Sequence, residues 1–241
     1  MIRAVLFDLD GTLVRFDPDR FLHEYVTSLG RAVAHMVEPR MFIKALLEST
    51  MVMVANTGPG TNREAFWSDI RNRIDCDFDE LEQVTTAYYG TEFAKLGASL
   101  GVVPHPSARP MMEWLIDSGY DVVIATNPMF PKVATAERMK WGGIDGLPYK
   151  LVSTYEDFHS CKPNASYFEE VLETIGRAPE ECLMVGNDLQ EDCAAGELGM
   201  RTYLVEDCLI DRGIECHQPD FRGSFDDMVE FMRSRLAEPI P

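Results

Sequence analysis

One run of residues near the start of the chain limits what the chain can fold into. Residues 2–7 are almost continuously apolar. A strand of this kind is typical of a parallel sheet with both faces covered. Asp8 and Asp10 follow at once, and alternate residues of a strand point to the same side. We therefore expect two carboxylates at the carboxyl end of a buried strand, where open α/β sheets place their active sites.

The two aspartates and the charge of the chain both favour a bound cation. Carboxylates that lie close together repel and raise each other's pKa. A hard divalent cation with oxygen ligands, such as Mg²⁺, offsets this repulsion. The chain has 22 basic against 40 acidic residues and a formal net charge of −18. Such a charge opposes binding to nucleic acid, and an anionic substrate would need a local positive centre.

Helical spacing of apolar residues dominates the next part of the chain. Between residues 17 and 100, apolar residues recur three and four positions apart. Asp17 and Pro18 have the composition of a helix cap followed by proline at the first helical position. Residues 56–61 are rich in glycine, proline and threonine and separate two helices. We therefore expect an all-helical insert over residues 15–102.

Beyond residue 102, short apolar runs alternate with helical segments. This alternation implies right-handed crossovers and a Rossmann-like α/β fold, a parallel sheet with helices on both faces. The first strand belongs to the same sheet, so the α/β core would comprise residues 1–14 and 103–241. The expected strands are 121–125, 151–153, 181–185 and 201–205, and the expected helices are 108–118, 131–140, 166–175, 192–198 and 224–236.

Two further sites have residues suited to binding a phosphoryl group. The apolar run 122–125 ends in Thr126 and Asn127, whose side chains can hydrogen-bond phosphoryl oxygens. Lys162 stands before a proline and a predicted helix, and its ammonium can act there as a point charge. Each site lies where a strand ends or a helix begins, so the fold can bring both beside the two aspartates.

A last site offers oxygen ligands after a predicted strand. Gly186 follows apolar residues and precedes Asn187, Asp188 and, four positions later, Asp192. We prefer Asp188 as a direct ligand of Mg²⁺, because a carboxylate binds the cation better than an amide does. Asp192 would then act indirectly or cap the following helix, and Asn187 and Asp192 remain alternative ligands.

In their order, these motifs resemble those of the haloacid dehalogenase-like (HAD) phosphohydrolases. Residues 7–12 read Phe-Asp-Leu-Asp-Gly-Thr, and the strand-terminal threonine, the Lys-Pro pair and the glycine with its acidic residues follow. The fourth motif departs from the family pattern, because Asn187 stands where an aspartate is common. The resemblance covers the α/β core. The insert matches the family's helical cap in position only.

The resemblance implies a Mg²⁺-dependent phosphatase that acts on a small phosphorylated metabolite through an aspartyl-phosphate. Asp8 would be the nucleophile and Asp10 the general acid/base. The implied catalytic residues are Asp8, Asp10, Thr126 and Lys162, the substrate-binding residues are Thr126, Asn127 and Lys162, and the metal ligands are Asp8, Asp10 and Asp188. A phosphomutase of the same family and a non-catalytic binding or regulatory module remain open alternatives. A dehalogenase is disfavoured, because a departing halide needs no proton from Asp10.

Composition argues against several other classes. No run approaches the roughly 18 apolar residues of a membrane span. The first strand begins at once and leaves no room for a signal peptide, so we expect a cytoplasmic protein without a membrane partner. The six cysteines form no Cys-x-x-Cys pair, which argues against a zinc site. Neither the substrate nor the oligomeric state follows from these motifs.

Overall fold

The computed structural model describes residues 1–236 and contains one parallel sheet within them. The strands are β1 Ala4–Phe7, β2 Asp121–Ile124, β3 Leu151–Val152, β4 Cys182–Gly186, β5 Arg201–Val205 and β6 Phe221–Gly223. Their order is β3-β2-β1-β4-β5-β6, and every neighbouring pair is parallel. The predicted α/β fold is confirmed, with β1 at the centre of the sheet.

Helices surround the sheet and also form a group beside it. Those after β1 are α1 Pro18–Ala32, α2 Pro39–Val54, α3 Asn62–Ile70, α4 Phe78–Gly90 and α5 Glu92–Ser99. The later ones are α6 Ala108–Asp117, α7 Lys132–Trp141, α8 Ala165–Ile175, α9 Leu189–Asp192 and α10 Phe225–Arg235, with 3₁₀ helices η1 Pro179–Glu181 and η2 Cys193–Leu198. None of the helices within residues 1–236 is both long and apolar enough to cross a membrane.

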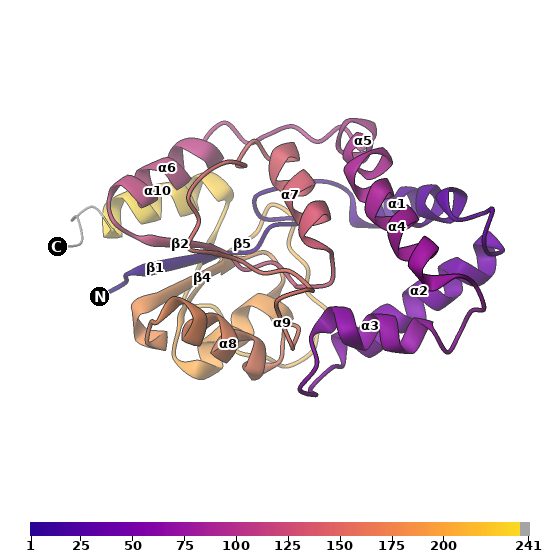
Figure 1. Ribbon diagram of the computed structural model, residues 1–241. Coiled ribbons are helices and arrows are strands. Elements are labelled where there is room, and N and C mark those ends of the chain that lie inside the picture. Colours follow the sequence, from indigo (N-terminus) through magenta and orange to yellow (C-terminus); the bar gives the residue numbers. More distant parts are fainter. Residues whose placement is uncertain (237–241) are drawn as a thin grey trace.

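Strand β1 is buried on both faces, which explains its continuous apolar run. Val5 and Phe7 pack on the side covered by α6 and α10, whereas Ala4 and Leu6 pack on the side covered by α8 (Figure 1). All four residues are fully buried. The strand begins at Ala4 rather than at residue 2, and it ends just before Asp8.

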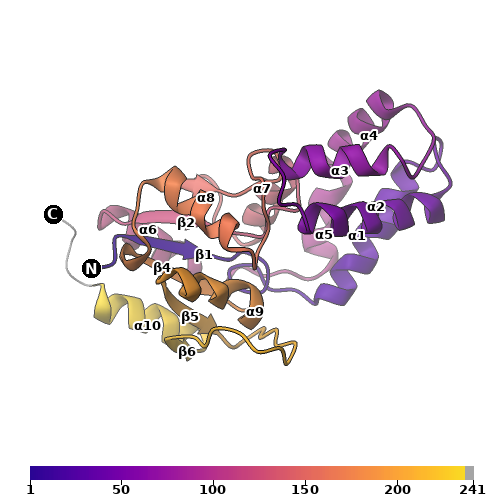
Figure 2. The same ribbon diagram turned by 90° about the horizontal axis from the view of Figure 1, so that it is seen from below.

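Helices α1–α5 lie beyond the carboxyl ends of the strands in both views (Figures 1 and 2). Asp17 caps α1 by accepting a hydrogen bond from a backbone N–H of the first turn, as predicted. The apolar faces of these helices form a cluster of their own, which also includes Ala134 of α7. The expected division of the chain at residues 15 and 102 stays a prediction, although the helical content of this region agrees with it.

The structure corrects the prediction in the carboxyl-terminal part of the chain. We expected 201–205 to be the last strand, but β6 adds another at the edge of the sheet. Its three residues include an arginine and a glycine, so they show no apolar alternation. The helix expected at 192–198 begins earlier, at Leu189, and continues as a 3₁₀ helix. Residues 237–241 of the expected core lie outside the described residues.

Candidate active site

Three strand ends lie side by side at the carboxyl edge of the sheet. Phe7 of β1 is in register with Ile124 of β2 and with Val185 of β4. The backbone N–H of Asp8 donates to the carbonyl oxygen of Val185 at 2.8 Å. Because the strands are parallel and end in register, the segments that follow them are neighbours. The sheet therefore brings the first, second and fourth motifs together.

Lys162 joins two of the predicted carboxylates at this edge. Its Nζ lies 2.9 Å from Oδ1 of Asp8 and 2.7 Å from Oδ1 of Asp192. The side chain of Lys162 is only 1% exposed, and both aspartates are buried. The lysine comes from the loop before α8, so a long-range contact fixes the position of the Asp8 carboxylate.

One buried ammonium cannot fully compensate two buried carboxylates. Burial raises the pKa of Asp8 to about 6, against the attraction of Lys162, which lowers it. Burial also raises the pKa of Asp192 to about 7. For Lys162, burial alone would lower the pKa, but Asp192 and then Asp8 raise it well above its ordinary value. The ammonium therefore stays charged, while the carboxylates retain excess negative charge that a further cation would offset.

Asp10 meets a different cation, in the turn that follows β1. Its Oδ2 pairs with Nη1 of Arg138, an α7 residue whose side chain is 1% exposed. The other oxygen, Oδ1, is buried and has no hydrogen-bond partner among the described residues. Burial raises the pKa of Asp10 and Arg138 opposes that rise. Asp10 in turn contributes to the raised pKa of Asp8, so the two carboxylates are close although each has its own partner.

Asn187 connects the first and fourth motifs. Its Oδ1 accepts a hydrogen bond from Oγ1 of Thr12 at 2.8 Å, and its Nδ2 donates to the carbonyl oxygen of Cys208 at 2.8 Å. Gly11 lies against this amide and has a φ of 87°, a backbone conformation that favours glycine. A Cβ at this position would overlap the Asn187 side chain. Both ends of the amide are thus engaged in holding loops together.

The structure gives the capping of α9 to Asp188 and not to Asp192. Asp188 caps α9, because its Oδ1 accepts from two backbone N–H groups of the first turn at 3.1 and 3.0 Å. The same Oδ1 lies 2.6 Å from Nη1 of Arg212. Asp192 instead contacts Lys162, and its Oδ2 accepts from the backbone N–H of Asp188 at 2.9 Å. Capping was one of two roles expected for Asp192, and it is not the role found, because the helix begins three residues earlier, at Leu189.

The second motif supports the third. Oδ1 of Asn127 accepts from the backbone N–H of Lys162 at 3.2 Å, and its Nδ2 donates to Oε2 of Glu191 at 3.0 Å. Thr126 is buried, and its carbonyl oxygen accepts from the hydroxyl of Tyr167 at 3.1 Å. Asn127 therefore positions the lysine loop, while Thr126 lies at the end of β2, beside β1.

Sequence reasoning missed three charged residues of the site, Arg138, Glu191 and Arg212. Arg138 lies four positions after Ala134 on the buried face of α7, a spacing that could have indicated a buried arginine. Glu191 belongs to an acidic run at a helix start. Arg212 lies in the irregular segment after β5 and contacts both Asp188 and Glu191. No local pattern marks Arg212.

The charges at the site fit a divalent cation. Five acidic and three basic side chains meet here, a net formal charge of −2 when all are ionised. Within residues 1–236, no three His, Cys, Asp or Glu side chains converge as ready metal ligands. Mg²⁺ does not need such a cluster, because it usually takes one or two carboxylates, substrate phosphate oxygens and water. Asp8 and the unpartnered Oδ1 of the neighbouring Asp10 suit that mode of binding, whereas Oδ1 of Asp188 is already held by two backbone N–H groups and Arg212.

Known proteins are similar to this chain over most of its length. Residues 2–198 match the haloacid dehalogenase-like hydrolase family. A pyrophosphatase PpaX of Bacillus cereus is 26% identical over 221 residues, 91% of this chain and 91% of the relative. A glyceraldehyde 3-phosphate phosphatase of Methanopyrus kandleri is 27% identical over 209 residues, 85% and 84% of the two chains.

Solved structures share the fold. The crystal structure of a HAD phosphatase from Thermococcus onnurineus superposes with a TM-score of 0.56 and 22% identity, over 99% of this chain and 100% of that one. The names of the two relatives, pyrophosphatase and phosphatase, agree with the predicted phosphatase type. With the family match over residues 2–198, the chain belongs to the haloacid dehalogenase-like hydrolases, as its motifs predicted.

Proposed function

We propose that this hydrolase cleaves phosphomonoesters of small metabolites with Mg²⁺ and through an aspartyl-phosphate. The contact between Asp8 and the buried ammonium of Lys162 carries the proposal. It holds one carboxylate oxygen at the end of the central strand, where the ammonium also neutralises an incoming phosphoryl group. Relatives named pyrophosphatase and phosphatase support a phosphohydrolase.

The proposed reaction has two steps, each a displacement at phosphorus. In the first, a carboxylate oxygen of Asp8 forms a bond to phosphorus while the bond from phosphorus to the ester oxygen breaks. Asp10 gives its proton to that departing oxygen, and its raised pKa suits a proton donor. In the second, Asp10 takes a proton from water, which attacks the same phosphorus and releases phosphate and free Asp8. When bound, Mg²⁺ supplies positive charge that lowers the repulsion between Asp8 and the phosphoryl oxygens.

Asp10→Asn should reduce kcat by about 10²–10⁴, the usual contribution of a general acid/base. The amide keeps the size of the side chain but cannot donate or accept the proton. Phosphate release should be measured with a 4-nitrophenyl ester and an alkyl ester, and the alkyl ester should suffer more, because its leaving oxygen needs the proton. The role of Asp10 would be wrong if saturating Mg²⁺ alone restored kcat.

Removal of divalent metal should abolish turnover of 4-nitrophenyl phosphate, and added Mg²⁺ should restore it. Asp188→Ala should raise the Mg²⁺ concentration needed for half-maximal rate by about tenfold or more. Asp226→Ala, which changes an exposed acidic residue on α10, serves as the control and should leave the Mg²⁺ titration unchanged. Normal Mg²⁺ dependence in Asp188→Ala would assign the ligand role to Asp192 or Asn187.

We further propose that residues 15–102 form a cap over the site. Asn62, at the start of α3, is fully buried, and its Nδ2 donates to the carbonyl oxygens of Pro128 and Ser160 at 3.2 Å each. These carbonyls stand one and two residues from Asn127 and Lys162. The helical insert thus contacts both phosphate-binding loops, which supports a role in closing the site and selecting the substrate.

A further inference from the structure

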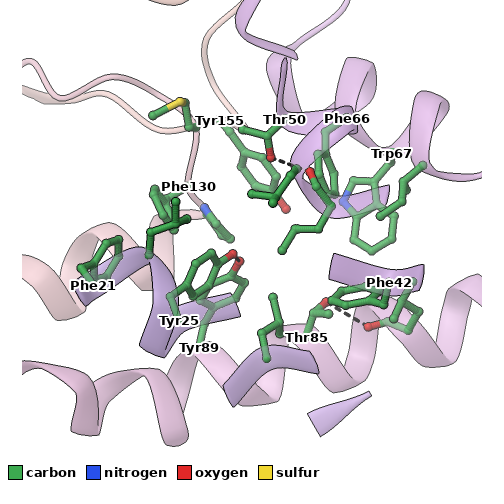
Figure 3. Close-up of a pocket in the computed structure, with 18 residues that line it drawn as sticks. Phe21, Tyr25, Phe42, Thr50, Phe66, Trp67, Thr85, Tyr89, Phe130 and Tyr155 are labelled. Carbon is green, nitrogen blue, oxygen red and sulfur yellow. Dashed lines mark hydrogen bonds between the residues drawn. The ribbon is translucent and has the colours of Figure 1, made fainter. Parts of the chain in front are cut away.

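An apolar cavity of about 220 Å³ lies between helices α1–α4 and the loops that follow β2 and β3 (Figure 3). Aromatic rings form much of its wall, with Tyr25, Tyr89 and Phe130 on one side and Phe66 and Trp67 on another. None of its lining residues is Asp, Glu, Lys, Arg or His. The cavity therefore offers no charged side chain to a ligand.

The hydroxyl groups on the wall are mostly engaged with the protein. Oγ1 of Thr50 donates to a backbone carbonyl of α2 at 2.8 Å, and Oγ1 of Thr85 donates to one of α4 at 2.9 Å. The hydroxyls of Tyr25 and Tyr89 bond to each other at 2.7 Å. Burial raises the pKa of both tyrosines, so both stay neutral. Since their mutual bond uses one hydrogen, this pair retains a single O–H for a ligand.

The cavity adjoins the reaction centre through Phe130. This residue lines the cavity and follows Asn127 by three positions, and three residues of chain span at most about 11 Å. The guanidinium of Arg138 lies over the Phe130 ring, 4.5 Å from its centroid, and also pairs with Asp10. One guanidinium group thus separates the cavity wall from the carboxylate that would protonate the leaving oxygen.

We propose that this cavity binds the leaving group of the substrate, and that this group is uncharged and apolar, of the size of a fused aromatic ring. The inference rests on the proposed phosphatase function. An apolar cavity of about 150 Å³ binds benzene, so this larger one has room for a naphthyl group. A second phosphate or a carboxylate would be buried there without a positively charged partner, which is strongly unfavourable. Pyrophosphate and phosphoglycolate should therefore be poor substrates.

Two residues of α2 provide a matched test. Leu47 lines the cavity and is 41% exposed, so it lies at the rim. Met51, one turn further along the helix, is 66% exposed and does not line the cavity. An aspartate should be tolerated by the fold at either position because both side chains reach solvent. Leu47→Asp places a short charge at the rim, where it cannot extend away as a lysine or arginine would.

The kinetic test compares 2-naphthyl phosphate with phosphoglycolate. The wild-type protein should have the higher kcat/KM for 2-naphthyl phosphate, and Leu47→Asp should lower that value by about tenfold or more. Met51→Asp should behave as wild type with both esters, and Leu47→Asp should lose less activity with phosphoglycolate than with 2-naphthyl phosphate, because phosphoglycolate has no ring to place in the cavity. A wild-type preference for phosphoglycolate, or equal losses with both esters in Leu47→Asp, would overturn the assignment.

A binding test separates the cavity from the chemistry. 2-Naphthol, which lacks phosphate, should bind the wild-type and Met51→Asp proteins, and Leu47→Asp should bind it about tenfold more weakly, as followed by naphthol fluorescence. Such binding without any ester hydrolysis would support the apolar site while contradicting the phosphatase function. Ester hydrolysis without Leu47-dependent naphthol binding would leave the phosphatase intact and overturn the proposed occupant.

Discussion

Asp8→Asn should lower kcat for phosphate release by at least about 10⁴-fold, since loss of a covalent nucleophile is among the largest effects of a single substitution. An amide does not form the acyl-phosphate bond that the first displacement requires. The variant should nonetheless fold, because asparagine has the same shape and its oxygen can accept from Lys162. Burial raises the pKa of Asp8 to about 6, which means that folding disfavours its charged form. Thermal unfolding of the variant should therefore occur at the wild-type temperature or above it.

Two measurements make this prediction specific to the covalent step. Wild-type protein quenched in acid during turnover should carry one phosphoryl group on the peptide that contains Asp8, and the variant should carry none. Asp8→Glu tests geometry, because it keeps the charge but moves the oxygens by one methylene, and it should also be inactive. Near-normal turnover by Asp8→Asn would contradict the mechanism, and so would a phosphoryl group on another peptide.

The strands of the sheet could be predicted where burial requires a run of apolar residues. β1 is buried on both faces, so every residue of it must be apolar, and the same holds for most of β4. β6 could not be predicted in this way. It pairs with β5 through three residues at an edge, and its central Arg222 is exposed. Backbone pairing alone produces no side-chain pattern.

The site was predictable where one short motif supplies a residue, and less so where distant segments meet. Asp8 and Lys162 each stand at the end of a strand or the start of a helix, so their contact follows from the topology. The N-capping role of Asp188 could not be predicted, because it depends on the residue at which α9 begins. Asp188 is also held by Arg212, 24 residues away. The apolar cavity has walls from four helices and two core loops, so no single periodicity describes it.

Lys162→Met should destabilise the metal-free protein by about 3–5 kcal/mol at pH 8, as expected when one partner of a buried ion pair is removed. Methionine fills most of the space of the lysine side chain. It leaves Asp8 and Asp192 buried without the ammonium that now lies 2.9 and 2.7 Å from them. Activity should fall as well, by about 10²–10³ in kcat, because the same charge would stabilise the phosphoryl oxygens.

The loss of stability should depend on pH in a definite direction. In the wild type, the pKa values of Asp8 and Asp192 are about 6 and about 7, above the ordinary 3.8, so folding stability falls as pH rises towards these values. Lys162 lowers both pKa values, so without it they are higher and the fall continues to higher pH. At pH 5 both carboxyls are mostly protonated in both proteins and need no ammonium. Urea unfolding in EDTA should therefore show a large difference at pH 8 and a small one at pH 5.

Lys140→Met, which changes an exposed lysine of α7, is the control and should leave unfolding unchanged at both pH values. An equal loss in Lys162→Met at pH 5 and pH 8 would mean that packing, and not charge, makes Lys162 important to the fold.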